Sequence, residues 1–197
     1  MLIQRLLAIS ALTFSLSGCF VPEKFDVEVD FAQDLSYSYT YEGTVAFFPA
    51  LVDIKGGKHS AQSDKKLESE GAAFKAKNPQ IQKFNYVGNG RYEALIKANR
   101  KPGERTDLLD TLVIATGKDG SQWVVAKTAN KDAAGMGDVG LKLDGHLKVK
   151  LPKNANILGT NGTVSDTLFG FGRKVVEWKV EKMNTRPHLS FNIGASK

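Results

Sequence analysis

The segment FDVEVDF, residues 25–31, carries the plainest structural pattern in this chain. Its apolar residues alternate with acidic ones, so a β-strand of this sequence places the apolar side chains on one face and the carboxylates on the other. The segment SYSYTY, residues 36–41, continues the alternation with three tyrosines on one side. Both segments therefore predict strands with one buried face, which is typical of antiparallel sheets.

Similar patterns recur along the rest of the chain. Residues 88–90 and 117–120 are turn sequences that join apolar segments, which predicts two β-hairpins. Residues 141–151 alternate over their whole length and are followed by Pro152. Strands are thus predicted at residues 25–31, 36–48, 81–87, 91–97, 109–116, 122–128, 141–151, 175–180 and 189–193.

One principal helix is predicted at residues 64–77, where Lys, Glu and Ala dominate. Ser63 is suited to cap its amino terminus, and Asn78-Pro79 ends it. Gly71 weakens this helix by about 1 kcal/mol relative to Ala. A shorter helical turn is expected at residues 50–55. The fold class is therefore α+β, with a mostly antiparallel curved β-sheet and one principal helix.

The first nineteen residues, MLIQRLLAISALTFSLSGC, differ in character from all that follows. Arg5 and the free amino group precede an apolar run, residues 6–16, that only Ser and Thr interrupt. That run is too short to span about 30 Å of hydrocarbon, which takes about 20 residues. Its length and flanks are typical of an export signal.

The tetrapeptide Leu16-Ser17-Gly18-Cys19 resembles the lipobox of bacterial lipoproteins. In that family the Cys thiol takes a diacylglycerol, the bond before it is cut, and the new amino terminus is acylated. The resemblance implies that residues 1–18 are removed and that membrane lipid is the partner of acylated Cys19. Because Phe20, and not Asp, follows the Cys, it also implies the outer membrane of the bacterial envelope. The alternative is an ordinary signal peptide with a chance Cys.

This interpretation divides the chain into three parts. Residues 1–18 are the signal peptide, residues 19–24 are the lipidated amino terminus with a short tether, and residues 25–197 form a single β-rich domain. Cys19 is the only Cys, so we expect neither a disulfide nor a metal site built from Cys. The net charge of +6 suits attraction to an anionic bilayer, although a solvated surface explains it as well. No nucleic-acid partner is expected for an exported chain.

No motif in the sequence predicts catalysis. His59, His146 and His188 lie in unrelated segments without the spacing of metal ligands. The sequence contains neither a GxSxG elbow nor a complete GxGxxG loop. We therefore expect no catalytic residues, no metal and no cofactor, and a hydrolase with a dispersed site is the remaining enzyme hypothesis.

Two segments are candidate contact sites. In residues 166–174, three large apolar side chains are interspersed with two glycines and precede two cations, a composition suited to a bilayer interface. The residues in question are Leu168, Phe169, Phe171, Arg173 and Lys174. The alternative is a hairpin tip folded onto its own core. The second candidate is the aromatic face of Tyr37, Tyr39 and Tyr41, which suits an amphipathic ligand or, alternatively, forms a stripe of the core.

The carboxy-terminal third contains a strand ending in Pro152, an Asn161-Gly162 turn and a strand centred on Trp178. Together with the lipobox, these features resemble the LppM-type lipoprotein domain of bacteria. The resemblance implies an exported α+β domain that touches lipids or envelope glycolipids, with no catalytic residues. Members often end in a transmembrane helix that this sequence lacks, so we expect the lipid alone to provide the anchor.

Two functions of different classes follow. The first is a membrane-anchored, non-enzymatic envelope lipoprotein that binds a lipid-like ligand or the membrane surface. The alternative is an accessory lipoprotein that docks an envelope protein partner. A closed apolar cavity favours the first, and an exposed sheet edge favours the second.

Overall fold

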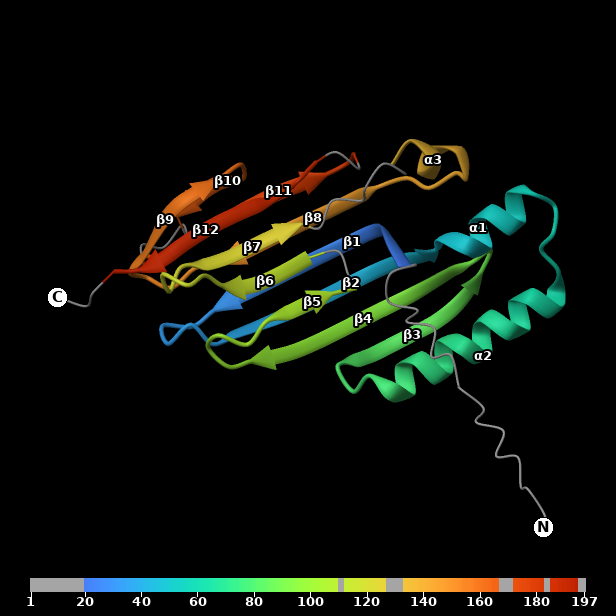
Figure 1. The fold of residues 1–197 in the computed structure, drawn as a ribbon, viewed down its shortest axis with the longest axis horizontal. Coiled ribbons are helices and arrows are strands. Elements are labelled where there is room, and N and C mark those ends of the chain that lie inside the picture. The colour runs from blue at the N-terminus through green and yellow to red at the C-terminus, as the bar shows by residue number, and fades with distance from the viewer. Residues whose placement is uncertain (1–19, 110–111, 127–132, 167–171, 183–184, 195–197) are drawn as a thin grey trace, which may run out of the picture.

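The segment at residues 25–31 lies in the middle strand of a seven-stranded sheet, and a five-stranded sheet faces it (Figure 1). This computed structural model describes residues 20–109, 112–126, 133–166, 172–182 and 185–194. Strands follow the order β10-β11-β8-β1-β2-β4-β3 in the larger sheet and β5-β6-β7-β12-β9 in the smaller one. All neighbouring strands are antiparallel except β1 and β8, so the α+β class with mostly antiparallel sheets is confirmed.

The elements have the following bounds. The larger sheet consists of β1 (Phe20–Phe31), β2 (Tyr37–Phe47), β3 (Ile81–Gly88), β4 (Arg91–Arg100), β8 (Asp144–Lys150), β10 (Thr163–Asp166) and β11 (Lys174–Val180). The smaller sheet consists of β5 (Thr106–Leu108), β6 (Leu112–Thr116), β7 (Gln122–Ala126), β9 (Ala155–Thr160) and β12 (His188–Ile193). The helices are α1 (Phe48–Lys55), α2 (Ala61–Lys77) and α3 (Ala133–Asp138).

The main core fills the space between the two sheets. Val29 and Phe31 of β1 are fully buried, and so are Leu189 and Phe191 of β12. The rings of Phe31 and Phe191 meet edge to face, with their centroids 4.9 Å apart. The acidic residues of the segment at 25–31 lie on the opposite face, where the carboxylate of Glu28 forms an ion pair with the ammonium of Lys150 on β8 at 2.7 Å. The alternation of residues 25–31 thus separates core from solvent as predicted.

The amino-terminal tether predicted for residues 19–24 is wrong from Phe20 onward. β1 begins at Phe20, which pairs with Phe47 of β2 and is 5% exposed. The strand pairing shifts between Pro22 and Lys24, and this irregularity breaks the alternation that a sequence pattern needs. Strand β1 thus already includes the residue that follows Cys19.

Helix α2 begins earlier than predicted, because Ser60 and not Ser63 is its N-cap. The hydroxyl of Ser60 accepts the backbone N–H of Ser63, and the hydroxyl of Ser63 accepts the backbone N–H of Ser60. This reciprocal capping box gives hydrogen-bond acceptors to two backbone N–H groups that have no partner within the helix. The helix then packs against β3 and β4, the edge strand of the larger sheet and its neighbour (Figure 1). Among the helices described, none has the length and apolar character that crossing a bilayer requires.

Candidate functional site

Part of the predicted contact site lies outside the described residues. These positions are Cys19, Leu168, Phe169 and Phe171. The strand ends next to them are described: Phe20 begins β1, and Asp166 pairs with Lys174 where β10 meets β11. The structure therefore shows where each of these segments joins the folded domain.

The two cations of the predicted membrane loop bind within the protein. The guanidinium of Arg173 donates to the carboxylate of Asp30 and to the carbonyl oxygens of Phe31 and Leu151, the last two at 3.0 Å. The ammonium of Lys174 donates to the carbonyl oxygen of Ala155 at 3.1 Å. Arg173 thus joins the start of β11 to the end of β1, and Lys174 joins it to the start of β9 in the smaller sheet.

The three tyrosines of β2 lie in the core between the sheets. Tyr37, Tyr39 and Tyr41 are 3%, 3% and 1% exposed. The hydroxyl of Tyr37 donates to the carbonyl oxygen of Glu104 at 2.8 Å, and burial raises the pKa of Tyr37 to about 12. Burial raises the pKa of Tyr41 as well. Their arrangement is that of the predicted alternative, a stripe of core residues.

Two open depressions lie on the larger sheet. One, of about 610 Å³, lies at the turn between β1 and β2 and is lined by Asp30, Ser36, Tyr37, Arg100, Lys153 and Arg173. The other, of about 670 Å³, lies on the polar outer face and is lined by charged residues that include Asp26, Glu42, His146, Lys148, Glu177 and Lys179. Neither is an enclosed apolar cavity of the kind that holds an acyl chain. Within the described residues, no group of three or more His, Cys, Asp or Glu side chains is placed to hold a metal ion.

The start of β1 lies at the end of the sandwich that carries α1 (Figure 1). We call this region the α1 end; it comprises the start of β1, the end of β2, α1 and the turn between β3 and β4. The backbone N–H of Phe47 donates to the carbonyl oxygen of Gly90 at 2.8 Å, so the turn lies against the entry to α1. A Cβ on Gly90 would come within 2.8 Å of the Cβ of Ala50, which shows how closely the two segments pack.

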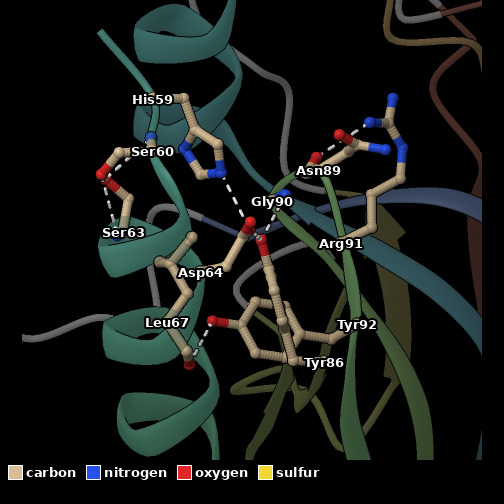
Figure 2. A network of polar contacts seen from close by, with 10 residues as sticks. All are labelled: His59, Ser60, Ser63, Asp64, Leu67, Tyr86, Asn89, Gly90, Arg91 and Tyr92. Carbon is tan, nitrogen blue, oxygen red and sulfur yellow. Dashed lines mark hydrogen bonds and ion pairs between the residues drawn. The ribbon is translucent and has the colours of Figure 1, made fainter.

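A polar network joins α2 to the β3–β4 turn at this end (Figure 2). Asp64 Oδ1 contacts His59 Nε2 at 2.8 Å and accepts a hydrogen bond from the hydroxyl of Tyr86. The same hydroxyl accepts the backbone N–H of Gly90 at 3.1 Å. The hydrogen bonds from Tyr86 and His59 hold the pKa of Asp64 below its usual range, whereas burial and the bond to Asp64 raise the pKa of Tyr86.

Among the described residues, this network joins a histidine to a carboxylate but holds no nucleophile bonded to that histidine. A nucleophilic mechanism needs a hydroxyl or thiol bonded to the base, with the base oriented by a carboxylate. His59 has the carboxylate, but among the described residues no hydroxyl bonds its other ring nitrogen. The contacts instead hold the start of α2 against the turn, which is a positioning role.

A partly buried ion pair joins the start of β1 to the start of β4. Nε and Nη2 of Arg91 donate to the two carboxylate oxygens of Glu23 at 2.7 and 2.8 Å. Glu23 is 9% exposed, and its hydrogen bond raises the pKa of Arg91. The two residues are far apart in sequence, so no local pattern could have predicted the pair.

No protein-family model matches this chain, and no curated protein matches it. Among solved structures, the chain is similar to an M1 zinc metallopeptidase from Deinococcus radiodurans, with 10% identity and a TM-score of 0.38 over 88% of this chain and 42% of that one. Native yeast LTA4 hydrolase gives 10% identity and a TM-score of 0.36 over 95% of this chain and 32% of that one. The chain thus spans less than half the length of these structures, and similarity at this level carries no argument about its function.

Proposed function

We propose that this chain is a lipid-anchored lipoprotein of the bacterial envelope, without catalytic activity, whose folded domain rests on the membrane that holds its acyl chains. The observation that carries the proposal is the junction between residues 19 and 20. The lipobox-like tetrapeptide ends at Cys19, and β1 begins at the next residue.

The packing of Phe20 fixes the first residue of β1 in the core. Its ring contacts those of Phe47, Phe74, Phe84 and Tyr92, with centroids 5.2 to 5.6 Å apart. A lipidated Cys19 would therefore hold the α1 end beside the bilayer, because Cys19 is bonded directly to the first residue of β1. Of the two lipid partners predicted, the membrane surface is the better supported, since the aromatic stripe of β2 fills the core.

The test is intact-mass analysis of the protein purified from membranes of a bacterium that processes lipoproteins. We expect a mature chain that begins at residue 19 and carries the mass of a diacylglycerol thioether with an amide-linked acyl chain. Cys19→Ala should abolish the acyl mass, whereas Ser15→Ala, upstream of the tetrapeptide, should keep it. A mature chain with an unmodified residue 19, or one that begins elsewhere, would contradict the proposal.

A second candidate function, docking of an envelope protein, is favoured by the outer face of the smaller sheet. Trp123 of β7 is 43% exposed there. It pairs with Ala115 and Ser190 on the neighbouring strands, and small side chains beside a Trp leave its ring open to a partner. Photo-crosslinking from Val125, also on β7, should capture one discrete protein that Trp123→Ala removes. Capture of the same protein from Lys97, on the larger sheet, would instead indicate a contact that does not involve this face.

A further inference from the structure

We infer that the α1 end is a membrane-binding face that contacts anionic phospholipid headgroups. This inference rests on the proposed anchor at Cys19, and it names the surface that the anchor brings to the bilayer. The face is defined by exposed side chains on α1, on the loop that follows it and at the end of β3: Val52, Lys55, Lys58 and Val87.

The first support is the exposure of two apolar side chains near Phe20, the first residue that the structure describes. Val52 of α1 and Val87 of β3 are 46% and 51% exposed. The turn after β3 packs on Ala50 through Gly90, so both valines lie on segments that meet beside the start of β1. A bilayer interface gives such side chains an apolar environment that water does not.

A second apolar cluster lies beneath this face. Ala46, Leu51 and Leu141 are buried together, and α1 therefore packs against the residues that follow α3. Val21, Met136, Val139 and Leu143 pack around them and are only partly buried. The α1 end thus contains a small buried core, and partly exposed apolar side chains surround that core near Phe20.

The charges at this end complement an anionic surface. Lys55 and Lys58 are exposed, and among the described residues neither has an ion-pair partner. Two nearby acids, Glu23 and Asp64, are engaged by Arg91 and by His59 with Tyr86, which leaves Asp53 as the exposed acid of α1. By contrast, Lys148 and Lys150 on the outer face of the larger sheet are ion-paired with Glu177 and Glu28.

The opposite end of the sandwich cannot share this bilayer when the α1 end faces it. Asp30, near the end of β1, pairs with Lys150, which pairs with Val175 at the start of β11. The strand ends that flank residues 167–171 therefore lie at the far end of β1. Twelve strand residues extend over about 36 Å. An anchor at Cys19 therefore brings the α1 end to the bilayer and keeps the opposite end of the sandwich away from it.

The experiment uses the lipidated full chain in vesicles that contain phosphatidylglycerol. Cys19 is the only Cys, so after lipidation an introduced Cys is the one free thiol available to a fluorescent label. Labels at Val52→Cys and Val87→Cys should be about threefold or more better protected from aqueous iodide than a label at Gln33→Cys, in the exposed turn after β1. Equal protection at the three positions, or stronger protection at Gln33→Cys, would overturn the inference.

A charge variant tests the headgroup contact separately from the anchor. Lys55→Glu combined with Lys58→Glu should abolish the protection at Val52→Cys. The matched control, Lys75→Glu with Lys77→Glu at the other end of α2, should leave it unchanged. If Val52→Cys protein with Lys55 and Lys58 intact stays on the vesicles but its label is not protected, or if the two Lys→Glu changes leave the protection unchanged, the inference fails and the anchor stands. If a free thiol is found at residue 19, the proposed function itself fails.

Discussion

Gly71 has a role at the residue scale that its helix propensity alone does not indicate. It is buried in the middle of α2, where a Cβ would come within 2.5 Å of Cε1 of Tyr92. That ring is not free to move, because its hydroxyl donates to the carbonyl oxygen of Leu67 at 2.8 Å and its face stacks on Phe84 at 4.6 Å. A glycine here weakens the helix but lets it approach the sheet.

We expect Gly71→Ala to destabilise the protein by up to about 2 kcal/mol. Overpacking a core costs about 1–3 kcal/mol, and this exceeds the gain of about 1 kcal/mol from better helix propensity. Urea unfolding measures the difference in the free energy of unfolding between Gly71→Ala and the wild-type chain. In a Tyr92→Ala background the clash is absent, so the same change should then stabilise; a stabilising Gly71→Ala in the wild-type chain would contradict the packing explanation.

Asp64 gives the protein an acid-sensitive contact. Hydrogen bonds from Tyr86 and His59 lower its pKa from the ordinary value of 3.8, so the ionised carboxylate favours the folded state above that pH. The stabilisation is lost as the pH falls through the lowered pKa of the folded state.

Thermal unfolding between pH 7 and pH 3 tests this contact. Asp64→Asn should lower Tm at pH 7, and the difference from wild type should narrow as the pH falls below 3.8. Asp53→Asn, an exposed position on α1, should show no comparable trend. If the Tm difference between wild type and Asp64→Asn stays constant with pH, the ionised carboxylate does not contribute to stability.

At the scale of elements, Asn161 joins the two sheets. It lies between β9 of the smaller sheet and β10 of the larger one. Its Oδ1 accepts hydrogen bonds from the indole N–H of Trp178 at 2.8 Å and from the backbone N–H of His188 at 3.0 Å. Its Nδ2 donates to the carbonyl oxygen of Arg186 at 2.8 Å. The Asn-Gly pair predicted as a turn is thus a crossover between sheets.

Asn161→Ala should lower the free energy of unfolding by about 1–3 kcal/mol, because the indole N–H of Trp178, a buried residue, loses its acceptor. The measurement is urea unfolding together with hydrogen exchange of that indole proton, which should become faster. Asn156→Ala, at an exposed position on β9, is the control and should change neither quantity. Unchanged exchange at Trp178 would show that Asn161 does not protect it.

At the scale of the whole molecule, the two sheets share one core, so they should unfold together. Each sheet holds one of the two tryptophans, Trp178 in β11 and Trp123 in β7. Trp123→Phe therefore leaves a fluorescence probe in the larger sheet, and Trp178→Phe leaves one in the smaller sheet. We expect the two probes to report coincident urea transitions.

Phe191→Ala should lower the stability seen by both probes by about 3–5 kcal/mol, since Phe191 is fully buried against Phe31 across the interface. Val164→Ala, an exposed position on β10, is a control that should change stability little. Two separate transitions, with only the smaller sheet affected by Phe191→Ala, would contradict a shared core.

The local parts of this fold were predictable, and the contacts between distant segments were not. The strands around residues 25–31 and 36–41 and the hairpin at residues 81–97 are confirmed, because alternation and turn residues are local signals. Strands β5, β9 and β10 were missed, and β9 and β10 belong to different sheets although only two residues separate them. Likewise, His59, Asp64 and Tyr86 follow no spacing that sequence analysis could have used.

Which side chains face the core follows from the amino-acid order alone, because a strand turns successive residues to opposite faces and each alternating segment therefore has one apolar side. The division of the strands between two sheets, and the placing of α1 beside the start of β1, arise only in the folded molecule. Strand β1 pairs with β8, more than 100 residues away, and no turn encodes that partnership. Strands can form backbone hydrogen bonds however far apart they lie in the sequence. Which strands become neighbours therefore depends on how their apolar faces pack into the shared core.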